Sequence, residues 1–166
     1  MKRIGLISDT HSHLDERLWG YLDCCDEVWH AGDFGSMAVA AALRAFRPLR
    51  GVYGNIDGRD IRADFPLDLR FECEGVPVWM THIGGYPGRY APRLKPLLRE
   101  DPPRGGLFVA GHSHILKVAP DREGGFLHLN PGACGLEGWH KVKTILRFTL
   151  SAGAISDLEV VEWPKF

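Results

Sequence analysis

Short apolar runs that end in polar residues recur along this chain of 166 residues, and they constrain its fold more than any other feature. The first run, Arg3–Ser8, has the length and composition of a buried parallel strand. Similar runs follow at Glu27–His30 and Leu49–Tyr53, after the helically spaced stretches Leu14–Asp23 and Ser36–Phe46. This alternation predicts parallel strands that are joined by crossover helices.

The second half of the chain favours antiparallel strands. Leu67–Cys73 and Val76–Thr81 flank Glu74-Gly75, which indicates a hairpin. Tyr90–Glu100 is typical of a helix, and Leu107–Ala110 of another buried strand. Four later segments are strand-like and partly alternating: Ile115–Ala119, Phe126–Leu129, Lys143–Leu150 and Ala154–Val161. Together these elements predict two packed mixed sheets with helices outside them.

Composition narrows the class of protein. The chain is 45% hydrophobic and 25% charged, which fits one globular domain over residues 1–166. Its formal net charge of −1 provides no long-range field that would attract nucleic acid or an anionic membrane. No stretch approaches the ~20 apolar residues of a membrane span, and the N-terminal run is too short for a signal peptide. We therefore expect a cytoplasmic protein whose four cysteines are free thiols.

Metal-compatible side chains follow five of the predicted strands. They are Asp9, His11, Asp33, Asn55, His82, His112 and His114. Taken singly, each could be a turn residue or a packed histidine. Ligands bind outside the carboxyl ends of strands in α/β sheets, and extended positions i and i+2 face the same side. The recurrence therefore predicts one metal site, and its nitrogen and oxygen donors suit Mn, Fe, Zn or Ni.

With these residues the chain resembles the calcineurin-like metallophosphoesterase superfamily, and most closely its small single-domain bacterial and archaeal phosphodiesterases. The matching motifs are Asp9-Thr10-His11, Gly32-Asp33, Gly54-Asn55-Ile56-Asp57, Thr81-His82, Gly111-His112-Ser113-His114 and Asn130-Pro131-Gly132. The resemblance covers nearly the whole chain. It implies an α/β fold, a four-layer α/β/β/α sandwich of two mixed sheets that carries a dinuclear metal site.

The resemblance also implies a role for each donor. Asp33 would bridge two divalent ions, with Mn expected first and Ni, Fe or Zn as alternatives. One ion would be held by Asp9, His11 and His114, and the other by Asn55, His82 and His112. A hydroxide activated between the ions would attack a phosphodiester. Asp33, Asn55 and His82 are the ligands to which we assign catalysis.

One position departs from the broader superfamily. Many members carry histidine directly after the motif asparagine, but here that position is Ile56. Isoleucine cannot transfer a proton, and a general acid typically contributes about 10²–10⁴-fold to a rate. The small phosphodiesterase branch also lacks this histidine. We therefore expect diesters with good leaving groups, and we expect the following Asp57 to be a helix cap or turn residue.

Other polar residues give weaker predictions. The Gly-rich loop after His82 contains Tyr86 and Arg89, which with Arg59 are our candidate substrate contacts, although such loops are often ordinary surface. Four further histidines match no motif and are expected to pack or to support loops: His13, His30, His128 and His140.

The expected partners follow from the same site. We expect a small phosphodiester substrate, no nucleic acid, no membrane and a homodimer. A non-catalytic scaffold is the main alternative, because the phosphoesterase-like subunit of the retromer coat resembles this fold. A phosphomonoesterase or a nuclease could use the same site.

Overall fold

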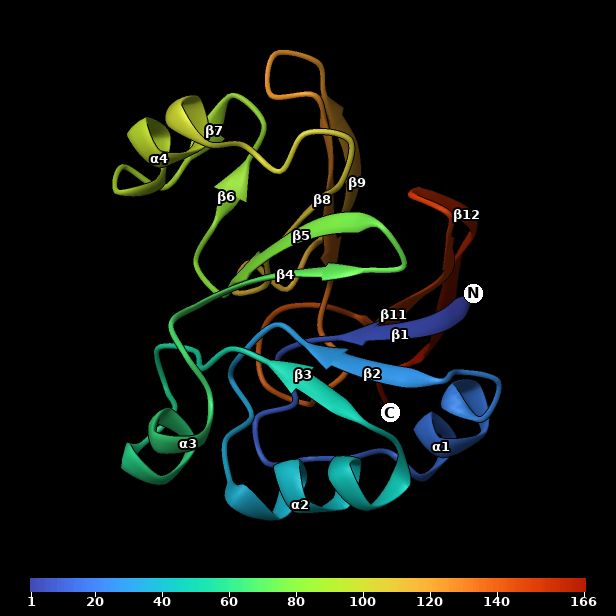
Figure 1. Ribbon diagram of the computed structural model, residues 1–166. Helices are drawn as coiled ribbons and strands as arrows, with labels where there is room; N and C mark the ends of the chain where they lie inside the picture. The colour runs from blue at the N-terminus through green and yellow to red at the C-terminus, as the bar shows by residue number, and fades with distance from the viewer.

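The computed structural model describes residues 1–166 and contains two five-stranded sheets (Figure 1). The first sheet has the order β12-β11-β1-β2-β3. Its strands are β1 (Lys2–Ile7), β2 (Glu27–His30), β3 (Leu49–Gly51), β11 (Val142–Ser151) and β12 (Ala154–Pro164). β1, β2 and β3 pair in parallel, as the strand–helix alternation predicts, and β11 joins β1 antiparallel.

The second sheet has the order β4-β5-β8-β10-β9. Its strands are β4 (Asp68–Cys73), β5 (Val76–Thr81), β8 (Leu107–Val109), β9 (Leu116–Asp121) and β10 (Phe126–Pro131). The predicted hairpin turns at Glu74 and Gly75, which both have positive φ, as a two-residue hairpin turn requires. The two outer pairings, β4 with β5 and β9 with β10, are antiparallel, but β8 lies parallel to both β5 and β10.

Four helices cover the sheets. They are α1 (Glu16–Leu22), α2 (Met37–Phe46), α3 (Arg59–Asp64) and α4 (Leu94–Glu100). Asp15 caps α1 by accepting a hydrogen bond from the Arg17 amide, whereas Ser36 precedes α2 without such a bond. α4 begins later than predicted because β7 (Arg89–Tyr90) pairs with β6 (Gly85–Tyr86). α3 was not predicted, since six residues are too few to show a helical period.

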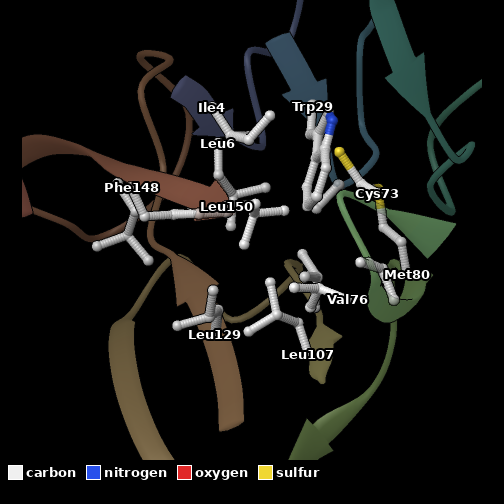
Figure 2. Close-up of a cluster of buried hydrophobic side chains, with 14 of the residues drawn as sticks. Ile4, Leu6, Trp29, Cys73, Val76, Met80, Leu107, Leu129, Phe148 and Leu150 are labelled. Carbon is white, nitrogen blue, oxygen red and sulfur yellow. The ribbon is translucent and has the colours of Figure 1, made fainter. Parts of the chain in front are cut away.

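Three apolar clusters confirm the layered α/β/β/α fold. The largest lies between the two sheets, where the rings of Trp29 and Phe148 meet edge to face at 5.6 Å (Figure 2). A second cluster joins the outer face of the first sheet to α1, α2 and α3. A third joins the outer face of the second sheet to α4, which lies far from α1 and α2 in Figure 1. Each sheet therefore packs apolar side chains on both of its faces.

Two smaller expectations can be compared with the structure. All four cysteines are free, and three of them are buried: Cys25, Cys73 and Cys134. None of the helices is both long enough and apolar enough to traverse a lipid bilayer.

Candidate metal centre

All seven predicted donors lie on loops that leave β1, β2, β3, β5 and β8 at their carboxyl ends. The donor atoms form two groups, in each of which they lie within 4.8 Å of one another. One group comprises Asp9, His11 and His114, and the other comprises Asp33, His82 and His112. Asn55 joins the second group, because its Oδ1 lies 3.0 Å from His112 Nδ1.

Asp33 lies between the two groups. Its Oδ2 is 3.4 Å from Nε2 of His11 in the first group and 3.2 Å from Nε2 of His82 in the second. In the first group, His114 Nε2 is 3.2 Å from Asp9 Oδ1. One carboxylate oxygen thus faces both groups of donors, which is the position that a bridging ligand needs.

The donors converge through left-handed turns rather than through extended backbone, contrary to our sequence argument. The φ angles are 55° at Asp9, 46° at His11, 61° at Asp33, 69° at His112 and 60° at His114. Such angles cost about 1–3 kcal/mol each in residues other than glycine, and they concentrate at functional sites. His112 and His114 consequently point to different groups although they are two residues apart.

Three buried polar atoms face one another without a hydrogen-bond partner. They are Asp9 Oδ1, His11 Nε2 and His82 Nε2. Buried polar atoms are nearly always paired, because an unpaired one loses its interactions with water. His82 Nε2 lies 3.2 Å from Asp33 Oδ2 and 3.8 Å from Asp9 Oδ1, but it forms a hydrogen bond with neither. Cations coordinated by these atoms would satisfy all three, so the residues fit a metal centre.

Neighbouring groups orient two of the donors. Ser8 Oγ and the His112 amide both donate to Asp9 Oδ2, at 2.6 and 3.1 Å, which leaves Oδ1 facing the centre. His82 Nδ1 donates to the Ala31 carbonyl at 2.7 Å, so that its Nε2 lone pair is available. Contacts of this kind fix the tautomer and the ring orientation of a metal ligand.

Asp57 supports the centre in a way that the sequence did not indicate. It is not the helix cap, because Gly58 occupies that position of α3. Its Oδ2 instead accepts hydrogen bonds from the amides of Asp33, Phe34 and Gly54, and its Oδ1 accepts one from Gly35. This buried carboxylate ties the loop after β2 to the loop after β3.

Gly54 and Gly111 allow close approach of the backbone to the centre. A Cβ on Gly54 would collide with Asp33 Oδ1, and one on Gly111 would collide with Ser8 Oγ. The loop that carries Asn55 therefore packs against the Asp33 carboxylate. The loop that carries His112 packs against Ser8, which donates to the Asp9 carboxylate.

The cluster shifts the pKa values of its members. Burial alone would raise the pKa of the Asp9 carboxyl. The nearby His11 and His114 imidazoles outweigh this effect and hold that pKa well below its usual range. Burial also acts to raise the pKa of Asp33, but the His11 and His82 imidazoles outweigh it, so this pKa is lowered as well. The Asp33 and Asp9 carboxylates raise the pKa of His11 to about 9. Without metal, His11 is therefore protonated at neutral pH.

His30 supports the loops, as expected of a histidine outside the motifs. Burial lowers its pKa to about 3, so the ring is neutral. Its Nδ1 accepts a hydrogen bond from the Gly32 amide at 3.1 Å, and its Nε2 lies 2.9 Å from Thr10 Oγ1. The ring also stacks on Phe34 with a centroid distance of 3.7 Å. His30 thus joins the loops after β1 and β2.

His140 lies beside the centre although no motif marked it. Its ring centroid is 5.4 Å from that of His114, and its Nε2 donates to the Gly135 carbonyl at 2.9 Å. A Cβ on Gly138 would collide with the His114 ring, so this loop packs directly against a predicted ligand. By contrast, His13 Nε2 lies 3.2 Å from Lys143 Nζ, and His128 is buried in the second sheet.

The three predicted substrate contacts do not join the cluster. Tyr86 is 40% exposed in β6, where Lys117 Nζ lies 5.1 Å from its ring centroid. Arg89 is exposed in β7, and Arg59 is the exposed first residue of α3. None of the three forms a hydrogen bond with a predicted metal ligand. Their role in binding substrate stays a prediction.

Several solved structures resemble this chain. A Thermotoga maritima protein determined by NMR in solution has 27% identity and a TM-score of 0.73, with 98% of this chain and 100% of that chain covered. A Streptococcus pneumoniae protein, described as a predicted phosphoesterase, has 22% identity and a TM-score of 0.66, with 99% and 90% covered. Vps29 from Entamoeba histolytica, complexed with Zn²⁺, has 16% identity and a TM-score of 0.66, with 96% and 98% covered.

A comparison with curated proteins found no match. The family model described as "Calcineurin-like phosphoesterase superfamily domain" matches residues 1–153, which include every predicted ligand. The same residues contain both groups of metal-compatible donors, and the solved relatives share the double-sheet fold. The chain therefore belongs to the calcineurin-like phosphoesterase superfamily.

Proposed function

We propose that this protein hydrolyses phosphodiesters with two divalent metal ions held by the seven clustered residues. The observation that carries the proposal is the set of unpaired buried atoms Asp9 Oδ1, His11 Nε2 and His82 Nε2 around Asp33 Oδ2. Asp9, His11 and His114 would hold one ion, and Asn55, His82 and His112 the other. Asp33 would bridge them, and Mn is the metal we test first, before Ni, Fe and Zn.

The residues of the chain orient the reacting groups. Two divalent ions held by these residues would supply a hydroxide near neutral pH and would clamp the phosphoryl oxygens. The Ala31 carbonyl fixes the His82 ring, and Ser8 fixes the Asp9 carboxylate, so the donors are ordered before substrate arrives. Such preorganisation reduces the reorganisation that the reaction requires.

Ile56 determines which esters suit the site. Its amide donates to Asp33 Oδ1 at 3.1 Å, so the residue lies beside the bridging carboxylate. Its side chain offers no proton to a departing alcohol, and the leaving group must leave as its anion or take a proton from water. This favours diesters whose leaving group has a low pKa.

The first prediction concerns a bis-aryl phosphodiester. Bis(p-nitrophenyl) phosphate should be hydrolysed when Mn²⁺ is added, with the nitrophenolate followed by absorbance. Asp33→Ala should lower kcat/KM by about 10³-fold or more, because it removes the bridge between two metal positions and leaves donors unpaired. Asp23→Ala, at a side chain that is 78% exposed and distant in the fold, is the control.

Two outcomes would contradict this assignment. Folded protein that turns over no ester with any divalent metal is not a phosphodiesterase. An Asp33→Ala variant with a rate near that of the parent would mean that Asp33 does not bridge.

The scaffold alternative is tested by metal content together with turnover. Vps29 shares this fold, and one Vps29 structure was determined in complex with Zn²⁺, so bound metal alone does not exclude a scaffold. Here all seven donors are present and clustered, which favours the enzyme. About two equivalents of metal per chain after purification, together with turnover of the diester, would support the catalytic proposal, whereas bound metal without turnover would support the scaffold. Comparison of p-nitrophenyl phosphate and a single-stranded oligonucleotide with the diester separates monoesterase and nuclease from phosphodiesterase.

A further inference from the structure

Exposed apolar residues flank the predicted metal ligands along the chain. Three isoleucines, each directly after a predicted ligand, are exposed by 47% (Ile56), 42% (Ile83) and 66% (Ile115). Trp139 is 100% exposed. We call these four residues the apolar collar. Buried positions hold the isoleucines of the sheets and helices, such as Ile4, Ile7, Ile61 and Ile145.

Backbone contacts attach the collar to the centre. The Ile56 amide donates to the second oxygen of Asp33. Trp139 stands between Gly138, which packs against the His114 ring, and His140, whose ring centroid lies 5.4 Å from that ring. Each member of the collar is therefore held beside a donor of the centre.

The centre is open to solvent at Asn55 and His112. Asp9 and His82 are almost fully buried, whereas Asn55 and His112 are exposed. A substrate therefore approaches over Asn55 and His112, and Ile56 directly follows the first of these residues. Single exposed apolar residues are common on proteins, but several that flank the ligands of one candidate site call for an explanation.

We propose that the collar binds an apolar ester group, so that the enzyme selects phosphodiesters of alkyl or aryl alcohols. This inference rests on the proposed function. With the phosphate at the centre, the ester substituents project towards the opening and meet three isoleucines and an indole. The four collar side chains carry a single polar atom, the Trp139 Nε1, so they offer little to the hydroxyl groups of a sugar. They gain most from burying hydrocarbon.

A series of esters with one constant leaving group tests the proposal. The methyl, butyl and hexyl p-nitrophenyl phosphodiesters differ only in the retained alcohol. We expect kcat/KM to rise with chain length, by about twofold to fourfold for each methylene that the collar buries. Trp139→Ser and Ile115→Ser should lower the hexyl-to-methyl ratio by about tenfold. Val160→Ser, at an exposed apolar side chain on β12, should not alter the ratio.

Binding provides a second readout that does not depend on turnover. Hexylphosphonate and methylphosphonate have C–P bonds that cannot be hydrolysed, and calorimetry with metal-loaded protein compares their affinities. The hexyl compound should bind about tenfold more tightly, and this advantage should be lost in Trp139→Ser. Equal affinities, with equal rates across the ester series, would overturn the collar proposal but leave phosphodiesterase activity standing.

Other outcomes have distinct signatures. Absence of turnover for every ester would overturn the proposed function, and this inference with it. Equal rates across the series, together with a concentration-dependent dimer that Trp139→Ser dissociates, would overturn the inference and identify the collar as an interface between copies.

Discussion

Individual residues explain why the ligand set could be read from the sequence although its geometry could not. Each donor follows an apolar run, and the run ends are visible in the sequence. The left-handed φ angles of His112 and His114 are not visible in the sequence, and at His112 the backbone amide donates to Asp9 Oδ2, a partner 103 residues away in the chain. Asp57 was missed as a support for the same reason, since three of its four partners lie 22–24 residues earlier in the chain.

His11 makes metal binding dependent on pH. Its pKa, raised to about 9 by Asp33 and Asp9, means that the metal-free ring is a cation at neutral pH. Nε2 must lose this proton to bind metal, so affinity should increase as pH rises from about 6.5 towards 9, with a proton released. Calorimetry in buffers of different ionisation enthalpy measures that proton. His11→Gln should reduce the release, and an affinity that is constant over this range would contradict the prediction.

The raised pKa of His11 also stabilises the folded state. This stabilisation decreases as pH rises, whereas metal affinity increases. The folded state binds the His11 proton more tightly than the unfolded state does, whose pKa is near 6.5. The stabilisation is therefore complete below about pH 6.5 and is lost as pH rises through 9. Unfolding of the metal-free protein by urea at pH 6.5 and pH 9 checks this sign.

Among the elements, the regular strands and helices were predictable and the short ones were not. β4 and β5 were evident from their alternation around Glu74-Gly75. β6, β7 and α3 span two, two and six residues, and such lengths carry no measurable period. The ribbon formed by β6 and β7 depends on a partner across a tight turn, which local propensity does not specify.

Asp57 couples the loops after β2 and β3, and a conservative substitution can test its role. Asp57→Asn keeps the size but replaces one acceptor oxygen with a donor, so at least one amide loses its partner. We expect metal affinity to fall about 10–100-fold and stability to fall by about 1–3 kcal/mol. Metal titration and urea unfolding measure the two effects. The exposed Asp60→Asn in α3 is the matched control.

If the affinity of Asp57→Asn equals that of the Asp60→Asn control, the carboxylate does not organise the donors. The hydrogen bonds to Asp33 and Gly54 would then be a consequence of the loop fold and not its cause.

The whole molecule depends on one core between two sheets. Leu146 is fully buried there, while Val160, its register partner on β12, is 46% exposed because the edge strand extends beyond that core. Leu146→Ala should reduce the free energy of unfolding by about 2–5 kcal/mol, and Val160→Ala should change it by about 0.5 kcal/mol or less. Urea unfolding measures both, and similar losses would contradict the layered core.

The sequence predicts two sheets, but it does not predict the order of the strands within each sheet. The parallel positions of β5, β8 and β10 could not be read from it, because a buried three-residue run such as Leu107–Val109 has no distinguishing pattern. The resemblance to a known superfamily provided the layer order, which the apolar clusters confirm.

The place of β1 has a consequence for synthesis of the chain. β1 lies between β2, which follows within about thirty residues, and β11, which begins at Val142 (Figure 1). While the ribosome is still translating the middle of the chain, one edge of β1 lacks its partner. The loop that carries Asp9 and His11 also lacks its contacts with later residues at that stage, such as the hydrogen bond from the Gly135 amide to the Asp9 carbonyl, so we expect metal to bind only after those residues are synthesised.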